Sequence, residues 1–152
     1  MHALNTLLER AVAERDLALV ALGNAQALVQ RQHDQLMQLA TYRVEYQQRW
    51  SDQFSRHGAM EIVQCYQGFM QRLDDAMAQQ QRQLDNANGS AERARETLLA
   101  RETRAASVRK LIERRVAEQR LAADRHAQRQ SDEHAQQARW RAHQDAAVST
   151  RY

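Results

Sequence analysis

The stretch LNTLLERAVAERDLALVALGNAQALVQRQHDQLMQLATYRVEYQQRW, residues 4–50, decides the fold of this chain. From Leu4, alternating steps of four and three residues reach an apolar side chain at almost every stop, and only Arg15, Gln32 and Arg43 interrupt the stripe. A mean step of about 3.5 residues keeps one narrow line of a helix facing a partner helix, which is typical of a coiled coil. The first stripe consists of Leu4, Leu8, Ala11, Arg15, Ala18, Leu22, Ala25, Val29, Gln32, Leu36, Leu39, Arg43, Tyr46 and Trp50.

A second stripe with the same kind of spacing follows in the later part of the chain. The sequence contains no proline, so neither stripe meets a residue that would break a helix. We therefore predict an all-α fold: one long antiparallel two-helix coiled-coil hairpin over residues 1–152, with helices at about 2–54 and 61–148 and the second helix longer. The second stripe consists of Ile62, Tyr66, Phe69, Leu73, Met77, Gln80, Leu84, Ala87, Ala91, Ala94, Leu98, Arg101, Ala105, Val108 and Ile112.

The turn between the helices is predicted at about residues 55–60. The segment Ser55-Arg56-His57-Gly58 offers a glycine for a left-handed cap and two side chains that suit the negative end of a helix dipole. With this turn, the numbers of facing residues add up to about 115. The segment 85–90, DNANGS, is a rival turn. The stripe passes through it without losing phase, so we expect only a weak or bent point there.

Charge is distributed unevenly along the chain. Residues 1–100 carry ten arginines against twelve acids, net −2, and residues 101–152 carry eleven arginines and Lys110 against seven acids, net +5. The acids are interspersed among the arginines, which favours a solvated helix over a nucleic-acid track. Few large apolar residues follow position 120, so the tail is predicted to be partly disordered or single-helical.

Residues with catalytic or metal-binding potential do not form a recognisable set. The six histidines lack metal-site spacing, the single Cys65 fits a reducing compartment, and no phosphate-binding glycine motif occurs. The neighbours Asp74 and Asp75 point about 100° apart on a helix and do not converge. No segment reaches the ~20 apolar residues of a membrane span, and the N-terminus lacks a signal pattern. We expect no enzyme activity, no cofactor, no metal and no membrane insertion.

Aromatic and apolar residues gather on both predicted helices beside the turn. The sum of 115 pairs Tyr46 with Phe69, Tyr42 with Leu73, Leu39 with Ala76 and Gln35 with Gln80. We expect Tyr42, Tyr46, Phe69 and Leu73 to be too bulky for a two-helix seam to hide completely. Exposed apolar patches usually mark binding sites, although these residues also suit a thick part of the core. We predict a partner surface, called here the aromatic patch, made of Gln35, Leu39, Tyr42, Tyr46, Phe69, Leu73, Ala76 and Gln80.

The order and spacing of three segments resemble the flagellar export protein FliJ family. They are Leu39-Ala40-Thr41-Tyr42-Arg43-Val44-Glu45-Tyr46, then Tyr66-Gln67-Gly68-Phe69-Met70-Gln71-Arg72-Leu73-Asp74-Asp75-Ala76, and finally Ser131-Asp132-Glu133-His134-Ala135. The resemblance implies a cytoplasmic stalk of the flagellar type III export apparatus, peripheral to the inner face of the cell membrane and serving flagellum biogenesis, motility and chemotaxis. It also implies association with the export ATPase FliI and its regulator FliH, with the export gate FlhA and with export chaperones.

The family's gate-binding surface corresponds to the eight residues of the aromatic patch. One position departs from the family pattern, because relatives often carry a histidine where this chain has Gln80. Two other functions fit a helical rod: the equivalent stalk of a virulence-type injectisome, and a basic coiled-coil nucleic-acid binder. Gene neighbourhood separates the first alternative from the flagellar stalk. The second is disfavoured because acids are interspersed along the basic tail and because the tail has few aromatic residues for stacking, only Trp140 and Tyr152.

Overall fold

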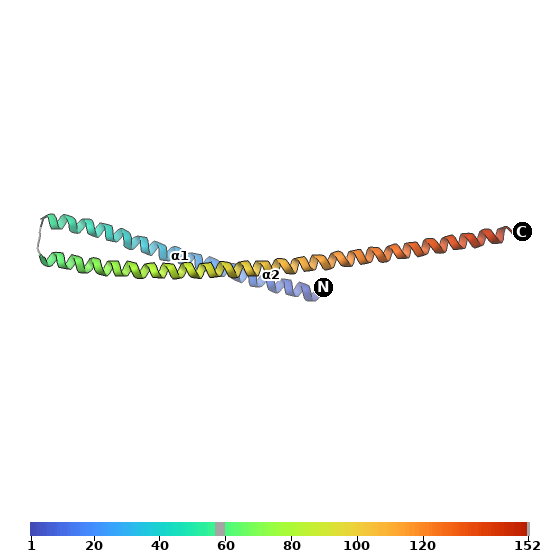
Figure 1. Ribbon diagram of the computed structural model, residues 1–152, viewed down its shortest axis with the longest axis horizontal. Coiled ribbons are helices and arrows are strands. Elements are labelled where there is room, and N and C mark those ends of the chain that lie inside the picture. The colour runs from blue at the N-terminus through green and yellow to red at the C-terminus, as the bar shows by residue number, and fades with distance from the viewer. Residues whose placement is uncertain (57–59, 152) are drawn as a thin grey trace. The chain divides into compact units, whose positions relative to one another are not determined.

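Two helices account for almost all of the computed structural model, which describes residues 1–56 and 60–151 (Figure 1). Helix α1 spans His2–Arg56 and helix α2 spans Met60–Ser149, and the described residues form no strand. The prediction of an all-α hairpin with a longer second helix is confirmed. The proposed turn residues His57 and Gly58 lie outside the described residues, so the cap expected at Gly58 stays a prediction.

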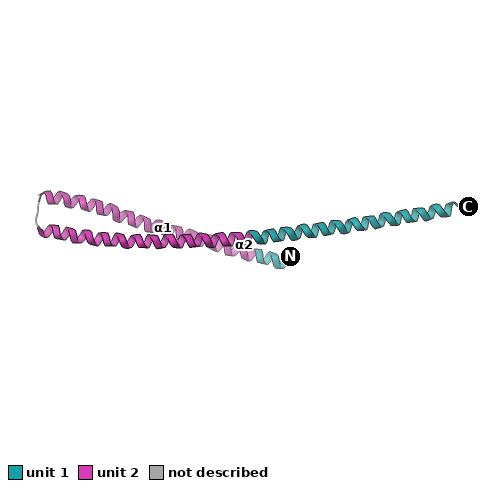
Figure 2. Ribbon diagram, in the orientation of Figure 1, with its two compact units in different colours: residues 1–8, 106–152 teal, residues 9–105 magenta. Residues whose placement is uncertain are grey.

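The structure divides into two compact units (Figure 2). One unit comprises residues 9–105 and contains the antiparallel pairing of α1 with the first half of α2. The other comprises residues 1–8 together with 106–152. The expectation of a single hairpin unit over residues 1–152 stays a prediction.

Both apolar stripes coincide with the covered faces of the two helices. Every residue of the two predicted stripes is buried or half-buried, including Arg15, Gln32 and Arg43, which interrupt the first one. The helices therefore cover each other along a single line, as steps of three and four residues require. We call this line the seam.

Seam side chains change in size along the unit of residues 9–105. Toward the ends far from the turn the seam uses alanine, and Ala11 and Ala105 are almost completely buried. Beside the turn it uses the rings of Tyr46, Trp50 and Phe69. Because the spacing of helix axes depends on the side chains between them, alanine permits a closer approach than rings do.

The two arginines that interrupt the first stripe each form an ion pair with an aspartate. Arg43 donates a hydrogen bond from Nε to Oδ1 of Asp74 on α2 at 2.7 Å. This hydrogen bond and the negative charge of Asp74 raise the pKa of Arg43 above its ordinary value. Arg15 instead donates to Asp16 on its own helix, at 2.8 Å from Nη2.

A second cross-helix contact lies at the alanine end of the seam. The Glu14 carboxylate lies 3.4 Å from a guanidinium nitrogen of Arg101 and of Arg104, both on α2, and 3.4 Å from Arg10 on its own helix. Glu14 and Arg101 have numbers that add up to 115, as the predicted register requires. Ion pairs therefore tie the two helices together at two distant levels.

Helix α2 continues through the segment 85–90 that offered a rival turn. Leu84, Ala87 and Ala91 are all buried there, so the stripe keeps its phase on the seam. None of the described glycines, Gly89 included, has a positive φ. The Asn and Gly residues of this segment are thus accommodated as ordinary helical residues.

Beyond Ile112 the second helix has no covered face. Residues 113–149 are helical, and all of them are exposed. Of the two states predicted for this tail, the structure shows the single-helical one. A helix without packing partners derives its stability only from local propensity and side-chain pairs, which is marginal in water.

The nearly complete burial of Ala105, at 1% exposure, gives a packing test. Replacing Ala105 with Leu should force the helices apart and lower the unfolding free energy by about 1–3 kcal/mol, measured by thermal circular dichroism. The exposed Ala100 on the same helix is the matched control, and Ala100→Leu should change it by less than about 0.5 kcal/mol. Equal melting of the two variants would contradict the assigned seam.

Hydrogen exchange should separate the paired and unpaired parts of α2. Amides of residues 70–105 should exchange slowly, because their helix opens only when the seam opens. Amides of residues 117–149 should exchange much faster, because local fraying exposes them. Uniform protection along α2 in mass-spectrometric exchange would show that the tail is covered in solution.

Candidate partner-binding site

A ladder of aromatic rings follows the seam beside the turn. The ring centroids of Tyr46 and Phe69 are 4.2 Å apart, which confirms the predicted pairing of these two residues across the helices. Tyr42 stands edge-on to Phe69 at 6.2 Å. Trp50 extends the ladder, with its ring 5.6 Å from that of Tyr66. Contacts of this geometry each stabilise by about 0.5–1.5 kcal/mol beyond simple burial.

Three glutamines close the other end of the aromatic patch. The side-chain amide of Gln80 donates to Oε1 of Gln32 at 2.6 Å and to the backbone oxygen of Gln32 at 3.0 Å. It also lies 3.2 Å from Oε1 of Gln35, so the predicted pairing of Gln35 with Gln80 is confirmed. These hydrogen bonds fix the amide orientation of Gln80 and give the seam a polar level.

The eight predicted patch residues differ in exposure. Tyr42 is 44% exposed, and Gln35 and Ala76 are also exposed. Leu39, Tyr46, Phe69 and Gln80 are half-buried. Leu73 is only 6% exposed, so the expectation that it is too bulky for the seam to hide is wrong. An aliphatic side chain is slimmer than a ring and fits inward between two helices.

Two open hollows meet at Tyr42. One has a volume of about 490 Å³ and is lined by Gln35, Gln38, Leu39, Tyr42 and Gln80, four of which belong to the aromatic patch. The other, of about 550 Å³, is lined by Asp34, Met37, Gln38, Thr41, Tyr42 and Glu45. Gln38 and Met37 were not among the predicted patch residues, because neither lies on the apolar stripe. The sequence feature that could have identified them is their spacing: Gln38 lies one helical turn before Tyr42, and Met37 lies one helical turn before Thr41.

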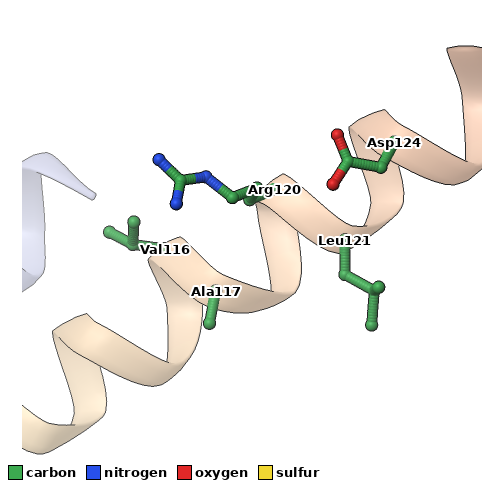
Figure 3. A pocket seen from close by; sticks show the side chains of 5 residues that line it. All are labelled: Val116, Ala117, Arg120, Leu121 and Asp124. Atoms are coloured by element: carbon green, nitrogen blue, oxygen red, sulfur yellow. The ribbon is translucent and has the colours of Figure 1, made fainter.

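A third hollow, of about 400 Å³, lies on the unpaired tail of α2. Figure 3 shows its lining, with Val116 and Arg120 on one line along the helix and Ala117 and Leu121 on a neighbouring line. Asp124 completes the lining. All five residues come from one helix, so this hollow is a surface depression that no second element closes.

The described residues contain no group of three or more histidine, cysteine or acidic side chains that could hold a metal ion. Among the same residues, no helix is both long and apolar enough to cross a membrane. Cys65 is exposed. The aromatic patch itself offers rings, aliphatic side chains and amides, with the acids Asp34 and Glu45 lining the hollow beside Tyr42.

The fold is that of a two-helix coiled-coil protein, and both of its helices contribute residues to the aromatic patch. A comparison with protein families matches residues 1–144 to the family described as flagellar FliJ protein. The chain belongs to the flagellar FliJ family, and this membership makes it a component of the flagellar type III export apparatus. Comparisons with curated proteins and with solved structures gave no match.

Unequal exposure within the patch predicts unequal effects of truncation. Leu73→Ala should leave a cavity in the seam and lower the unfolding free energy by about 2–5 kcal/mol. Tyr42→Ala should lower it by only about 0.5–1.5 kcal/mol, because mainly ring contacts are lost. Thermal unfolding followed by circular dichroism measures both. A larger loss for Tyr42→Ala than for Leu73→Ala would reverse the assignment of core and surface.

Proposed function

We propose that the chain is a non-enzymatic stalk and adaptor of flagellar protein export. In this role it links the export ATPase ring, FliI with its regulator FliH, to the export gate FlhA, and recycles export chaperones. It acts in the cytoplasm, peripherally at the inner face of the cell membrane. The observation that carries the proposal is a partly exposed aromatic patch to which both helices contribute, in a chain of the flagellar FliJ family.

The patch has the composition of a protein-binding surface. Tyr42 lies between two open hollows and touches the rings of Tyr46 and Phe69, so its position is fixed before any partner arrives. Rigid aromatic side chains surrounded by adaptable amides are typical interface anchors. We assign contact with the export gate to Gln35, Leu39, Tyr42, Tyr46, Phe69, Ala76 and Gln80, with Leu73 supporting this surface from beneath.

Cross-helix contacts should stiffen the paired helices of residues 9–105, as a stalk requires. Within residues 9–105, Glu14 contacts Arg101 and Arg104, and Arg43 contacts Asp74. Sliding one helix along the other would break both sets of ion pairs and displace the aromatic ladder. A force applied to one helix is therefore shared by the other, which supports transmission of movement between two binding partners.

Truncation of the exposed anchor tests the proposal. Tyr42→Ala should weaken binding to the cytoplasmic domain of FlhA about thirtyfold, because removing an aromatic anchor typically costs about 2 kcal/mol. Binding to FliI should be unchanged, since the helical seam persists. Calorimetric titration against each partner measures both affinities.

Leu99→Ala is the matched control, because Leu99 is 64% exposed and lies on α2 outside the patch. It should leave both affinities as in the wild type. Unchanged FlhA binding by Tyr42→Ala would overturn the assignment of the patch to the gate. A parallel loss of FlhA and FliI binding with a lowered melting temperature would show that the patch acts as core.

A further inference from the structure

One carboxylate is shared by three guanidinium groups at the alanine end of the seam. The carboxylate of Glu14 lies 3.4 Å from one guanidinium nitrogen of each of three arginines, Arg10, Arg101 and Arg104. A charge-assisted hydrogen bond between such groups is normally about 2.7–2.9 Å long. Each guanidinium group has five N–H donors. Most donors of the three arginines are therefore left for another acceptor.

These guanidinium groups also face solvent. The side chains of Arg101 and Arg104 are 42% and 49% exposed, and that of Arg10 is 77% exposed. Glu14 is the most covered member of the cluster, at 27% exposure. Three positive charges against one negative charge leave a local net charge of +2. An anion that approaches from solvent therefore meets the arginines before it meets the acid.

The same side of α2 continues to a fourth arginine. Arg93, Thr97, Arg101 and Arg104 follow one another in steps of four, four and three residues, which places them on one side of the helix. Arg93 is exposed, forms no ion pair with any of the described residues, and donates to a neutral hydroxyl on its own helix at 3.1 Å. Arg93 and Arg104 are about 16 Å apart along the helix. We call Arg10, Arg93, Arg101 and Arg104 the arginine edge.

The chemistry of the arginine edge suits carboxylates. It already holds one, that of Glu14, and guanidinium groups bind carboxylates through their forked N–H donors. Neither residues 5–20 of α1 nor residues 85–110 of α2 include an aromatic residue, so this part of the surface lacks the stacking platform of a nucleic-acid groove. Cations spaced by one to three helical turns match acidic side chains that recur along a peptide.

We propose that the arginine edge is a docking surface for an acidic segment of a partner protein. Carboxylates of this segment pair with the free donors of Arg93, Arg101 and Arg104, in competition with Glu14. Exposed ion pairs each contribute little and are screened by salt, so the contact is reversible and weakens with ionic strength. The arginine edge shares no residue with the aromatic patch, so the chain presents two binding surfaces of different chemistry.

Fluorescence anisotropy of a labelled oligoglutamate peptide, titrated with the full chain at low ionic strength, tests the proposal. The double variant Arg93→Gln/Arg104→Gln should bind the peptide about fivefold more weakly than the wild type, because two exposed charge pairs are lost. Arg125→Gln/Arg129→Gln is the matched control. It removes the same charge from exposed positions on the unpaired part of α2 and should bind like the wild type.

Glu14→Gln separates docking from a purely structural role of the cluster. The amide keeps the size of the side chain but no longer competes as an anion for the arginines, so the peptide should bind about threefold more tightly. A purely structural role predicts a lower melting temperature and no gain in affinity. Circular dichroism melting of every variant checks that the hairpin persists, which is expected for Arg93 and Arg104 because both are exposed.

Three outcomes would overturn the proposal: a wild type that does not bind the peptide, two double variants that bind it equally, or a Glu14→Gln variant that gains no affinity. A labelled single-stranded DNA that loses affinity for Arg93→Gln/Arg104→Gln, while the peptide does not, would assign the arginine edge to nucleic acid instead. None of these variants changes the aromatic patch, so the proposed gate contact keeps its own test.

Discussion

Two helices that touch along one line share a core only one side chain deep, and the paired part of this molecule depends on that contact. Each seam side chain is buried only by the facing helix, because no second layer of residues lies behind it. The seam therefore contains the almost completely buried alanines Ala11 and Ala105 at one end and the rings of Tyr46 and Phe69 near the other. A thin core also leaves large side chains partly uncovered, which is why the same residues provide both cohesion and a surface for recognition.

Polar residues in the seam have a clear physical role. Arg43 and Gln32 interrupt an apolar stripe, yet each contacts α2, through Asp74 and Gln80 respectively. A polar group in a seam lowers stability, but it penalises every register in which it lacks its partner. Alanine recurs every seven residues at Ala11, Ala18 and Ala25, so registers shifted by seven residues would also place alanine in the seam. The paired polar residues select one of them, and in doing so they bring Tyr42, Gln35 and Gln80 to the same hollow.

The sequence was sufficient to predict the two helices, the seam and the pairing of Tyr46 with Phe69, because each follows from a periodicity that every residue of a stripe repeats. The exposure of each side chain in the aromatic patch could not be predicted from this periodicity. The register places Leu73 and Tyr42 at the same level, but it does not say which side chain turns inward. Arg43 was recognised only as an interruption, since a stripe on one helix contains no information about the acid on the other. The roles of Gln38 and Met37 depend on hollows formed by side-chain conformation, which no spacing rule predicts.

The hairpin connection also determines the order in which contacts close. Trp50 and Tyr66 lie on either side of the connection, so only a short loop closes when their rings meet. Gln35 and Gln80 are 45 residues apart in the sequence, and Glu14 and Arg101 are 87 residues apart. Closing a longer loop costs more entropy, although the cost grows slowly with length. Pairing of the two helices should therefore begin at the aromatic ladder and extend along the seam toward Glu14. Thermal opening follows the reverse path, so the alanine end separates first while the surface around Tyr42 remains assembled.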